Sequence, residues 1–220
     1  SFAARSGKLP DSALDSAYLA KCEAQVIAAG DMQLGFSQAS AYGTSFPTQT
    51  KAVQGAGWYF SQDQAFDMTV AYQITPKPEY MAAIIANMNY EGGCNPVNLC
   101  YLSGLGWKRD RDVVSQYAEN DRRLSPPSGE PVGNICSTFS ALWTYPNNVL
   151  GQFSIPADGG ANQMPFYDRN GDSWNVTCEF VILNQARALG SLAFVASQTS
   201  LKSQAWKAPT AQITVTTVDP

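Results

Sequence analysis

The chain has 220 residues, of which 45% are hydrophobic and 15% are charged, so it is long and apolar enough to bury a core. Its net charge of −4 argues against a nucleic-acid partner, because such a partner requires a basic surface. The sequence contains no histidine, which excludes a Ser-His-Asp triad, a Cys-His pair and His-ligated zinc within this chain. Any chemistry must therefore depend on carboxylates, Tyr, Lys, Arg or Cys.

The cysteines are dispersed and odd in number: Cys22, Cys94, Cys100, Cys136 and Cys178. Because no CxxC pair occurs, the sequence indicates neither a zinc knuckle nor a dense disulfide framework, and we expect mostly buried free thiols. No apolar run approaches the roughly 20 residues of a membrane-spanning helix. The chain also lacks a signal segment. We interpret it as an internal piece of a longer protein or as a trimmed mature chain.

The hydrophobic periodicity predicts two long helices in the first third of the chain. The first spans residues 11–29 and is amphipathic, with Asp11 as its N-cap and Gly30 as the residue that ends it. The second spans residues 58–74, where Phe66 and the apolar residues after it recur at helical spacing.

Two further long helices follow. One spans residues 77–90, with Pro78 in its first turn and Gly92-Gly93 behind its last turn. The other spans residues 177–198 and is apolar on most faces, so we expect a central and well-buried element.

Shorter helices are predicted at residues 109–120 and 136–145. Long connections rich in Gly, Pro and Asn join the helices, at residues 31–50, 91–108, 121–135 and 146–172. Loops of this length are commonly functional. The sequence therefore predicts an all-α scaffold that carries long, aromatic-rich loops on one side.

The pattern changes after Trp206, where apolar residues alternate with threonines. This period of two is typical of a β-strand. We interpret residues 199–209 as a linker and residues 210–220 as the first strand of a following β module. A C-terminal tail strapped onto the helical domain is the alternative.

The segment FYDRNGDSWNVTCEF, residues 166–180, has the oxygen-ligand spacing of a calcium-binding EF-hand loop. Its oxygen-bearing side chains at positions 1, 3, 5 and 12 are Asp168, Asn170, Asp172 and Glu179. Position 6 is Ser173, however, where the turn of an EF-hand requires glycine, and no helix pattern precedes the loop. A calcium site of another kind, built on the first three of these residues, remains open.

A second group of polar and aromatic residues lies within residues 87–134. Trp107 follows a Ser-Gly-Leu-Gly turn, and arginines interleaved with aspartates follow it: Arg109, Arg111, Arg122 and Arg123. One interpretation is a solvated, salt-bridged helix. The other is the wall of a groove, in which the tryptophan stacks on sugar rings and the arginines form bidentate hydrogen bonds to hydroxyls.

Three segments, taken in order, resemble the C-terminal half of a glycoside hydrolase family 9 catalytic domain, the endoglucanase or cellulase family. They read NMNYEGGCNPVNLCYLSGLG, PPSGEPVGN and YDRNGDSWNVTCEFVILNQARAL. In that family a helix ends in an Asn-Pro turn followed by a Tyr-x-x-Gly-x-Gly segment. A Pro-Pro-Gly loop comes next, and then a Tyr-Asp segment before a helix that starts near an acidic residue. The resemblance covers residues 75–200.

The resemblance implies that residues 1–200 form part of an (α/α)6 barrel, with residues 201–220 as linker and strand. It also implies inverting hydrolysis of a β-1,4-glucan by a secreted or periplasmic protein. No cofactor is required, although calcium remains open. Carried over by position, Glu179 is the general acid. The substrate-binding positions are Trp107, Arg109, Arg122, Arg123, Tyr167 and Asp168.

The chain departs from the family pattern in three ways. The Asp-Ala-Gly motif that carries the catalytic base is absent, and ENDRR stands where His-His-Arg is expected. A barrel of twelve helices also needs roughly twice this length. We therefore expect the N-terminal half of the same domain as a partner, besides a polysaccharide or oligosaccharide substrate. A non-catalytic carbohydrate-binding remnant and a calcium-dependent structural module are the alternatives.

Overall fold

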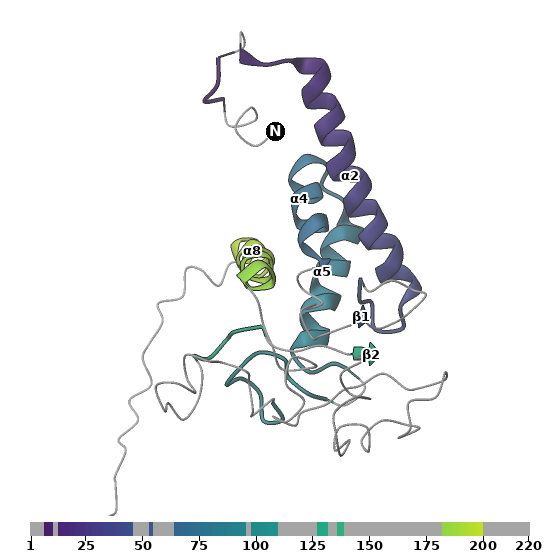
Figure 1. The fold of residues 1–220 in the computed structure, drawn as a ribbon, viewed down its shortest axis with the longest axis vertical. Coiled ribbons are helices and arrows are strands. Elements are labelled where there is room, and N and C mark those ends of the chain that lie inside the picture. Colours follow the sequence, from purple (N-terminus) through teal and green to yellow (C-terminus); the bar gives the residue numbers. More distant parts are fainter. Residues whose placement is uncertain are drawn as a thin grey trace, which may run out of the picture.

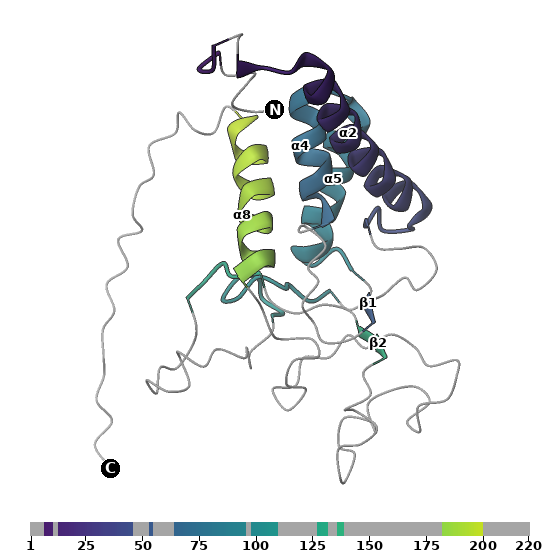
Figure 2. The ribbon, with the colours of Figure 1, turned by 45° about the horizontal axis from the view of Figure 1, so that its top comes forward.

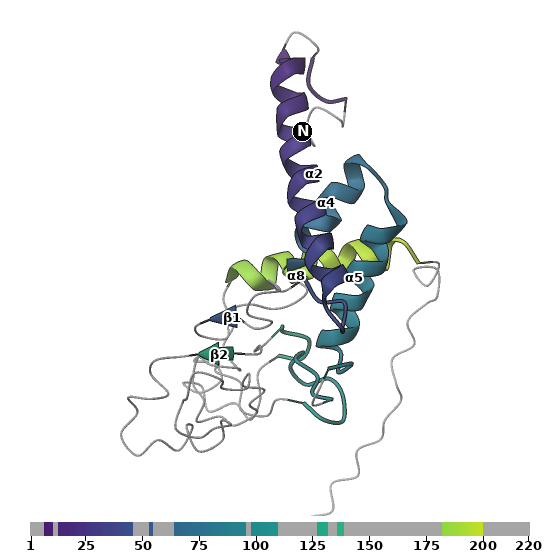
Figure 3. The ribbon, with the colours of Figure 1, turned by 90° about the vertical axis from the view of Figure 1, so that its right-hand side faces the viewer.

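The computed structural model describes residues 7–10, 13–45, 53–54, 64–95, 98–109, 127–131, 136–138 and 182–199. Within these ranges it contains α-helices and one pair of short strands, in the order α2 (Ser16–Ala39), β1 (Val53–Gln54), α4 (Phe66–Ile74), α5 (Pro78–Glu91), β2 (Cys136–Thr138) and α8 (Ile182–Ser197). Helices α2, α4 and α5 lie side by side, and α8 crosses beside them at a steep angle (Figure 1, Figure 3). The strand pair and the loop of residues 98–109 lie at one end of the helices.

Helix α2 differs from its prediction at both ends. Its N-cap is Asp15 rather than Asp11, because the Asp15 carboxylate accepts a hydrogen bond from the Tyr18 N–H at 3.0 Å. The helix continues through Gly30 to Ala39, so the prediction that Gly30 ends it was wrong. Gly30 serves instead as a packing position, since a Cβ there would lie 2.5 Å from the Cβ of Ala71 on α4.

Helix α5 confirms the helix predicted at residues 77–90. Pro78 occupies its first turn, where a missing N–H costs nothing, and the Gly92 N–H donates to the Met88 carbonyl at its end. Helix α4 covers the last part of the helix predicted at residues 58–74, of which 58–63 lie outside the described residues.

The hydrophobic core lies between α4, α5 and α8. Its buried members are Ala65, Met68, Ala71, Tyr80, Ala83, Ile84 and Phe194. The rings of Tyr72 and Phe194 meet edge to face with their centroids 5.3 Å apart, which joins α8 to α4. Small residues at several of these positions let the helix axes approach closely.

The strand pair corrects a prediction. Residues 136–138 form β2, which pairs in parallel with β1, and not the start of a helix over 136–145. A short apolar run fits either structure, and here a partner more than 80 residues away along the chain decides between them. The remainder of that segment lies outside the described residues. So do the helix predicted at 109–120, apart from residue 109, and the linker and strand predicted at 199–220, apart from residue 199.

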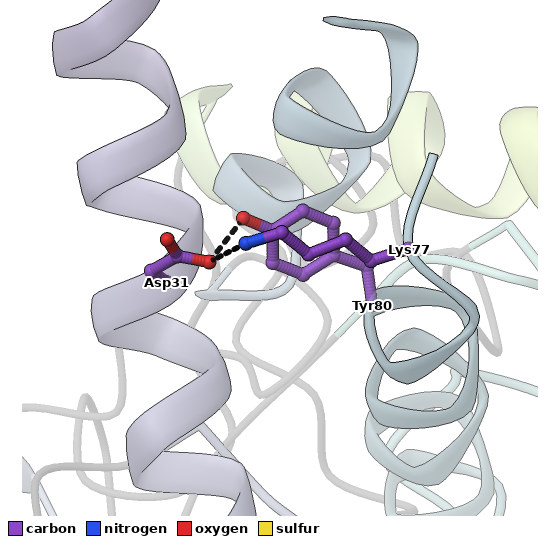
Figure 4. A network of polar contacts seen from close by, with 3 residues as sticks. All are labelled: Asp31, Lys77 and Tyr80. Atoms are coloured by element: carbon purple, nitrogen blue, oxygen red, sulfur yellow. Dashed lines mark hydrogen bonds and ion pairs between the residues drawn. The ribbon is translucent and has the colours of Figure 1, made fainter. Parts of the chain in front are cut away.

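A polar contact ties α2 to the start of α5 (Figure 4). Lys77 Nζ lies 2.6 Å from Asp31 Oδ1, and the Tyr80 hydroxyl donates to the same oxygen. The hydrogen bond from Lys77 lowers the pKa of Asp31, and the same bond raises the pKa of Lys77. Desolvation raises the pKa of Tyr80. Asp31 and Lys77 are partly exposed and Tyr80 is buried, so the group joins the two helices at the edge of the core.

None of the described helices combines sufficient length with sufficient apolar character to cross a bilayer.

Candidate functional site

The loop that leaves α5 is closed by one side chain. Asn95 donates from Nδ2 to the Tyr90 and Leu99 carbonyls, at 2.8 and 2.7 Å, and its Oδ1 accepts from the Leu99 N–H at 3.1 Å. Both polar ends of a buried amide are thereby satisfied, which stabilises one loop conformation. Asn95 is the asparagine of the Asn-Pro turn identified in the sequence, so that motif has a structural role at the base of the loop.

Two glycines shape the next turn. Gly104 and Gly106 adopt φ values of +68° and +74°, which other residues rarely adopt. A Cβ at Gly106 would also lie 2.8 Å from the Cβ of buried Cys100. The Ser-Gly-Leu-Gly sequence therefore allows a tight turn that directs Leu105 and Trp107 outward, with 44% and 89% of their surfaces exposed.

Trp107 lies between two hydrogen bonds that hold the loop. The Cys100 N–H donates to the Lys108 carbonyl at 2.9 Å, and Arg109 Nη1 donates to the Gly106 carbonyl at 3.1 Å. The second contact uses one of the five N–H donors of the guanidinium. An indole of 89% exposure is thus presented on a braced loop beside an arginine. Flat aromatic faces and planar donors are suited to binding the faces and hydroxyls of sugar rings.

Ser103 joins this loop to residues 127–131. Its N–H donates to the Glu130 carbonyl at 2.8 Å, and its carbonyl accepts from the Gly129 N–H at 2.7 Å. Its hydroxyl donates to the Pro127 carbonyl at 2.5 Å and accepts from the Glu130 N–H at 3.0 Å. Four hydrogen bonds on one buried serine make these two segments a single unit.

The same unit reaches the first turn of α8. Gln185 Nε2 donates to the Pro131 carbonyl at 2.5 Å. The described parts of the three sequence segments that carry the family resemblance therefore meet at one end of the helices (Figure 2). Of the predicted site residues, Trp107 and Arg109 lie in this unit. The other five lie outside the described residues: Arg122, Arg123, Tyr167, Asp168 and Glu179.

Glu130 is a site candidate that the sequence analysis did not single out. Its Oε2 is buried and has no hydrogen-bond partner within the described part of the chain. Desolvation raises the pKa of this carboxyl above its ordinary value of 4.5. A carboxyl that holds its proton more readily can donate a hydrogen bond or a proton. The sequence signal that could have indicated Glu130 was its position as the one acidic residue of PPSGEPVGN.

Metal ligands and thiols were searched among the same described residues. No group of three or more His, Cys, Asp or Glu side chains that could hold a metal occurs among them. The calcium ligands considered from the sequence, residues 168, 170 and 172, lie outside the description. Cys22, Cys94 and Cys100 are free thiols, as expected, although only Cys100 is buried. Its burial raises its thiol pKa, so it is not a reactive thiolate.

Comparison with known proteins identifies the fold. No family profile and no curated protein matches the sequence. A metagenome-derived glycoside hydrolase family 9 endoglucanase matches 82% of this chain with 29% of its own, at a TM-score of 0.54 and 18% identity. A GH9 protein from Bacteroides ovatus matches 82% of this chain with 29% of its own, at a TM-score of 0.53 and 19% identity. AaCel9A, solved with a cellobiose-like isofagomine, matches 86% of this chain with 34% of its own, at a TM-score of 0.59 and 13% identity.

These matches establish a fold, since the identities are low and the TM-scores exceed 0.5. The chain has the fold of part of a family 9 endoglucanase, which confirms the resemblance predicted from the sequence and its helical scaffold. It spans about a third of the length of the chains it matches.

Proposed function

We propose that this chain is part of an inverting glycoside hydrolase that cleaves a β-1,4-glucan or a related plant-type polysaccharide. Two observations support this function: the endoglucanase-like fold and the order of the three motif segments. The observation that carries it is Trp107, which is 89% exposed on a loop braced by hydrogen bonds at both sides. An indole held in this exposed position has its flat face free to stack on a sugar ring.

Substrate binding would depend on this loop. The Trp107 ring stacks on the apolar face of a sugar, and Arg109, already fixed to the Gly106 carbonyl, donates to hydroxyls of the same or the next ring. The hydrogen bonds through Ser103 keep the platform in place before substrate arrives, which reduces the entropic cost of binding. Arg122, Arg123, Tyr167 and Asp168 complete the proposed substrate-binding residues.

Hydrolysis would require two carboxyl groups. Glu179, three residues before the first described residue of α8, is the proposed general acid that protonates the leaving oxygen. An inverting enzyme also needs a carboxylate ~6.5–9.5 Å away, which activates a water on the opposite face of the sugar. Since this chain has no Asp-Ala-Gly motif, we assign that base to polypeptide beyond these 220 residues. Calcium is not needed for this chemistry.

The test uses the whole natural polypeptide that contains these residues, with cellohexaose as substrate. Trp107→Ala should weaken binding by roughly tenfold, about 1.4 kcal/mol, and leave kcat unchanged. Glu179→Gln should abolish hydrolysis and retain binding. Tyr18→Ala, an exposed aromatic in the first turn of α2, is the matched control and should change neither. NMR of the released anomer would identify inversion.

The possible results separate the alternatives. Full activity in Glu179→Gln would refute the assignment of the acid. Binding that depends on Trp107, without hydrolysis by the natural polypeptide, would favour the non-catalytic carbohydrate-binding protein. Equal binding by Trp107→Ala and the unmodified polypeptide would refute the sugar platform.

A further inference from the structure

Helix α8 has an inverted distribution of polarity. Its buried residues include Asn184 and Ser191, whereas its solvent-exposed side carries a continuous apolar stripe. We name this the α8 stripe; its residues are Ile182, Ala186, Leu189, Ala193 and Ala196. The steps of four and three residues between them place all five on one face of the helix. Ile182 and Leu189 are 88% and 67% exposed.

The orientation of α8 is fixed by its other face. The ring of Phe194 packs on Tyr72, and the Thr69 hydroxyl donates to Ser191 Oγ at 3.4 Å. Gly190 faces Phe66 of α4 so closely that a Cβ there would lie 2.9 Å from the Phe66 ring. These contacts hold the polar residues inward and the α8 stripe outward. The exposed apolar face is therefore a property of the packing and not of a loosely placed helix. Figure 2 shows α8 beside α4.

The α8 stripe has the chemistry of a helix-packing surface. It contains no charged or hydrogen-bonding side chain, and its three alanines would let another helix axis approach to roughly 8–10 Å. Arg187 does not interrupt it, because its guanidinium lies over the Phe66 ring on the inner side, 6.0 Å from the centroid. A charged ligand or a polysaccharide would make no polar contact here. An apolar helix, in contrast, would bury its own apolar side chains against this surface.

The fold comparisons bear on where such a helix comes from. The matched structures use 82–86% of this chain but only 29–34% of their own, so most of each matched chain has no counterpart in these residues. We propose that the α8 stripe docks an apolar helix of the remaining part of this fold, carried by polypeptide outside the 220 residues. This proposal rests on the fold and not on hydrolytic activity.

The test compares thermal unfolding of variants in the whole natural polypeptide that contains these residues. Leu189→Glu should lower its Tm by more than about 5 °C, because a carboxylate would enter an apolar interface. Gln198→Glu, which adds the same charge at an exposed polar position beyond α8, should leave the Tm unchanged. In the isolated 220-residue chain both variants should match the unmodified chain.

Leu189→Ala provides a milder version, with a smaller loss of Tm, should the charged variant not fold. Equal Tm values for Leu189→Glu and Gln198→Glu in the natural polypeptide would overturn the proposal. So would light scattering that shows a dimer of this chain converted to monomer by Leu189→Glu, because the occupant would then be a second copy. A polypeptide without glucanase activity that still shows the Leu189 effect would refute only the hydrolase proposal.

Discussion

Gly30 offers a direct test of how closely α2 and α4 pack. A Cβ at this position would lie 2.5 Å from the Ala71 Cβ and 3.4 Å from both the Asp67 carbonyl oxygen and Tyr80 Cζ. Carbon atoms in relaxed contact are about 3.5–4.0 Å apart, so Gly30→Ala must push the two helices apart by roughly 1 Å. Overpacking of this kind costs about 1–3 kcal/mol.

The same helix contains a matched control. Gly35 has no atom within 4 Å of an added Cβ, so Gly35→Ala meets no obstacle. Both substitutions gain about 1 kcal/mol of helix propensity, which cancels when the two variants are compared. Their difference therefore isolates the clash at Gly30. We expect Gly35→Ala to be more stable than Gly30→Ala by about 1–3 kcal/mol, which is about 2–12 °C in Tm for a chain of this size.

The assay is thermal and urea unfolding followed by far-UV circular dichroism. Adding Ala71→Gly to the Gly30→Ala variant removes the opposing methyl, so the double-mutant cycle should show a coupling energy of at least about 0.5 kcal/mol. Equal Tm values for Gly30→Ala and Gly35→Ala would refute the close approach of α2 and α4 at this point.

Two further predictions concern pH. Asp31→Asn should lower the Tm near neutral pH. Because the pKa of Asp31 is lowered in the folded protein, the stabilisation by its carboxylate is complete above the ordinary pKa of 3.8 and is lost as the pH falls through the folded pKa. Melting curves that differ equally at acidic and neutral pH would contradict this. Glu130→Gln should raise the Tm near neutral pH and have no effect at pH values well below 4.5. Because burial raises the pKa of Glu130, the folded protein favours the protonated carboxyl, and this stability is lost as the pH rises through the folded pKa. A lower Tm for Glu130→Gln near neutral pH would mean that the carboxylate is held by a favourable partner.

The local signals in the sequence were sufficient for α5. Proline in the first turn and glycine behind the last turn mark its ends, and both act through the backbone of the residues next to them. The asparagine and glycines of the loop after α5 were likewise visible as turn residues. Their hydrogen bonds and positive φ angles are set within a few residues, so the braced position of Trp107 follows from a local pattern.

Contacts between distant residues explain where the sequence analysis failed. Gly30 was interpreted as a helix end, yet its place in α2 depends on Ala71, 41 residues further along the chain. The strand at residues 136–138 depends on Val53 in the same way. Glu130 became a candidate only when its burial was known, since nothing in its neighbouring residues shows that its Oε2 has no hydrogen-bond partner within the described part of the chain.

By itself, the sequence determined the helical scaffold, the turns of the loop that carries Trp107 and the family resemblance, because each depends on local conformation or on the order of motifs. Only the tertiary structure decided that Ser103 and Gln185 join the described parts of the three motif segments into one unit. It also decided which face of α8 is covered. Polarity alone would place Asn184 and Ser191 on the solvent side of α8, whereas packing against α4 covers that side and leaves the α8 stripe exposed.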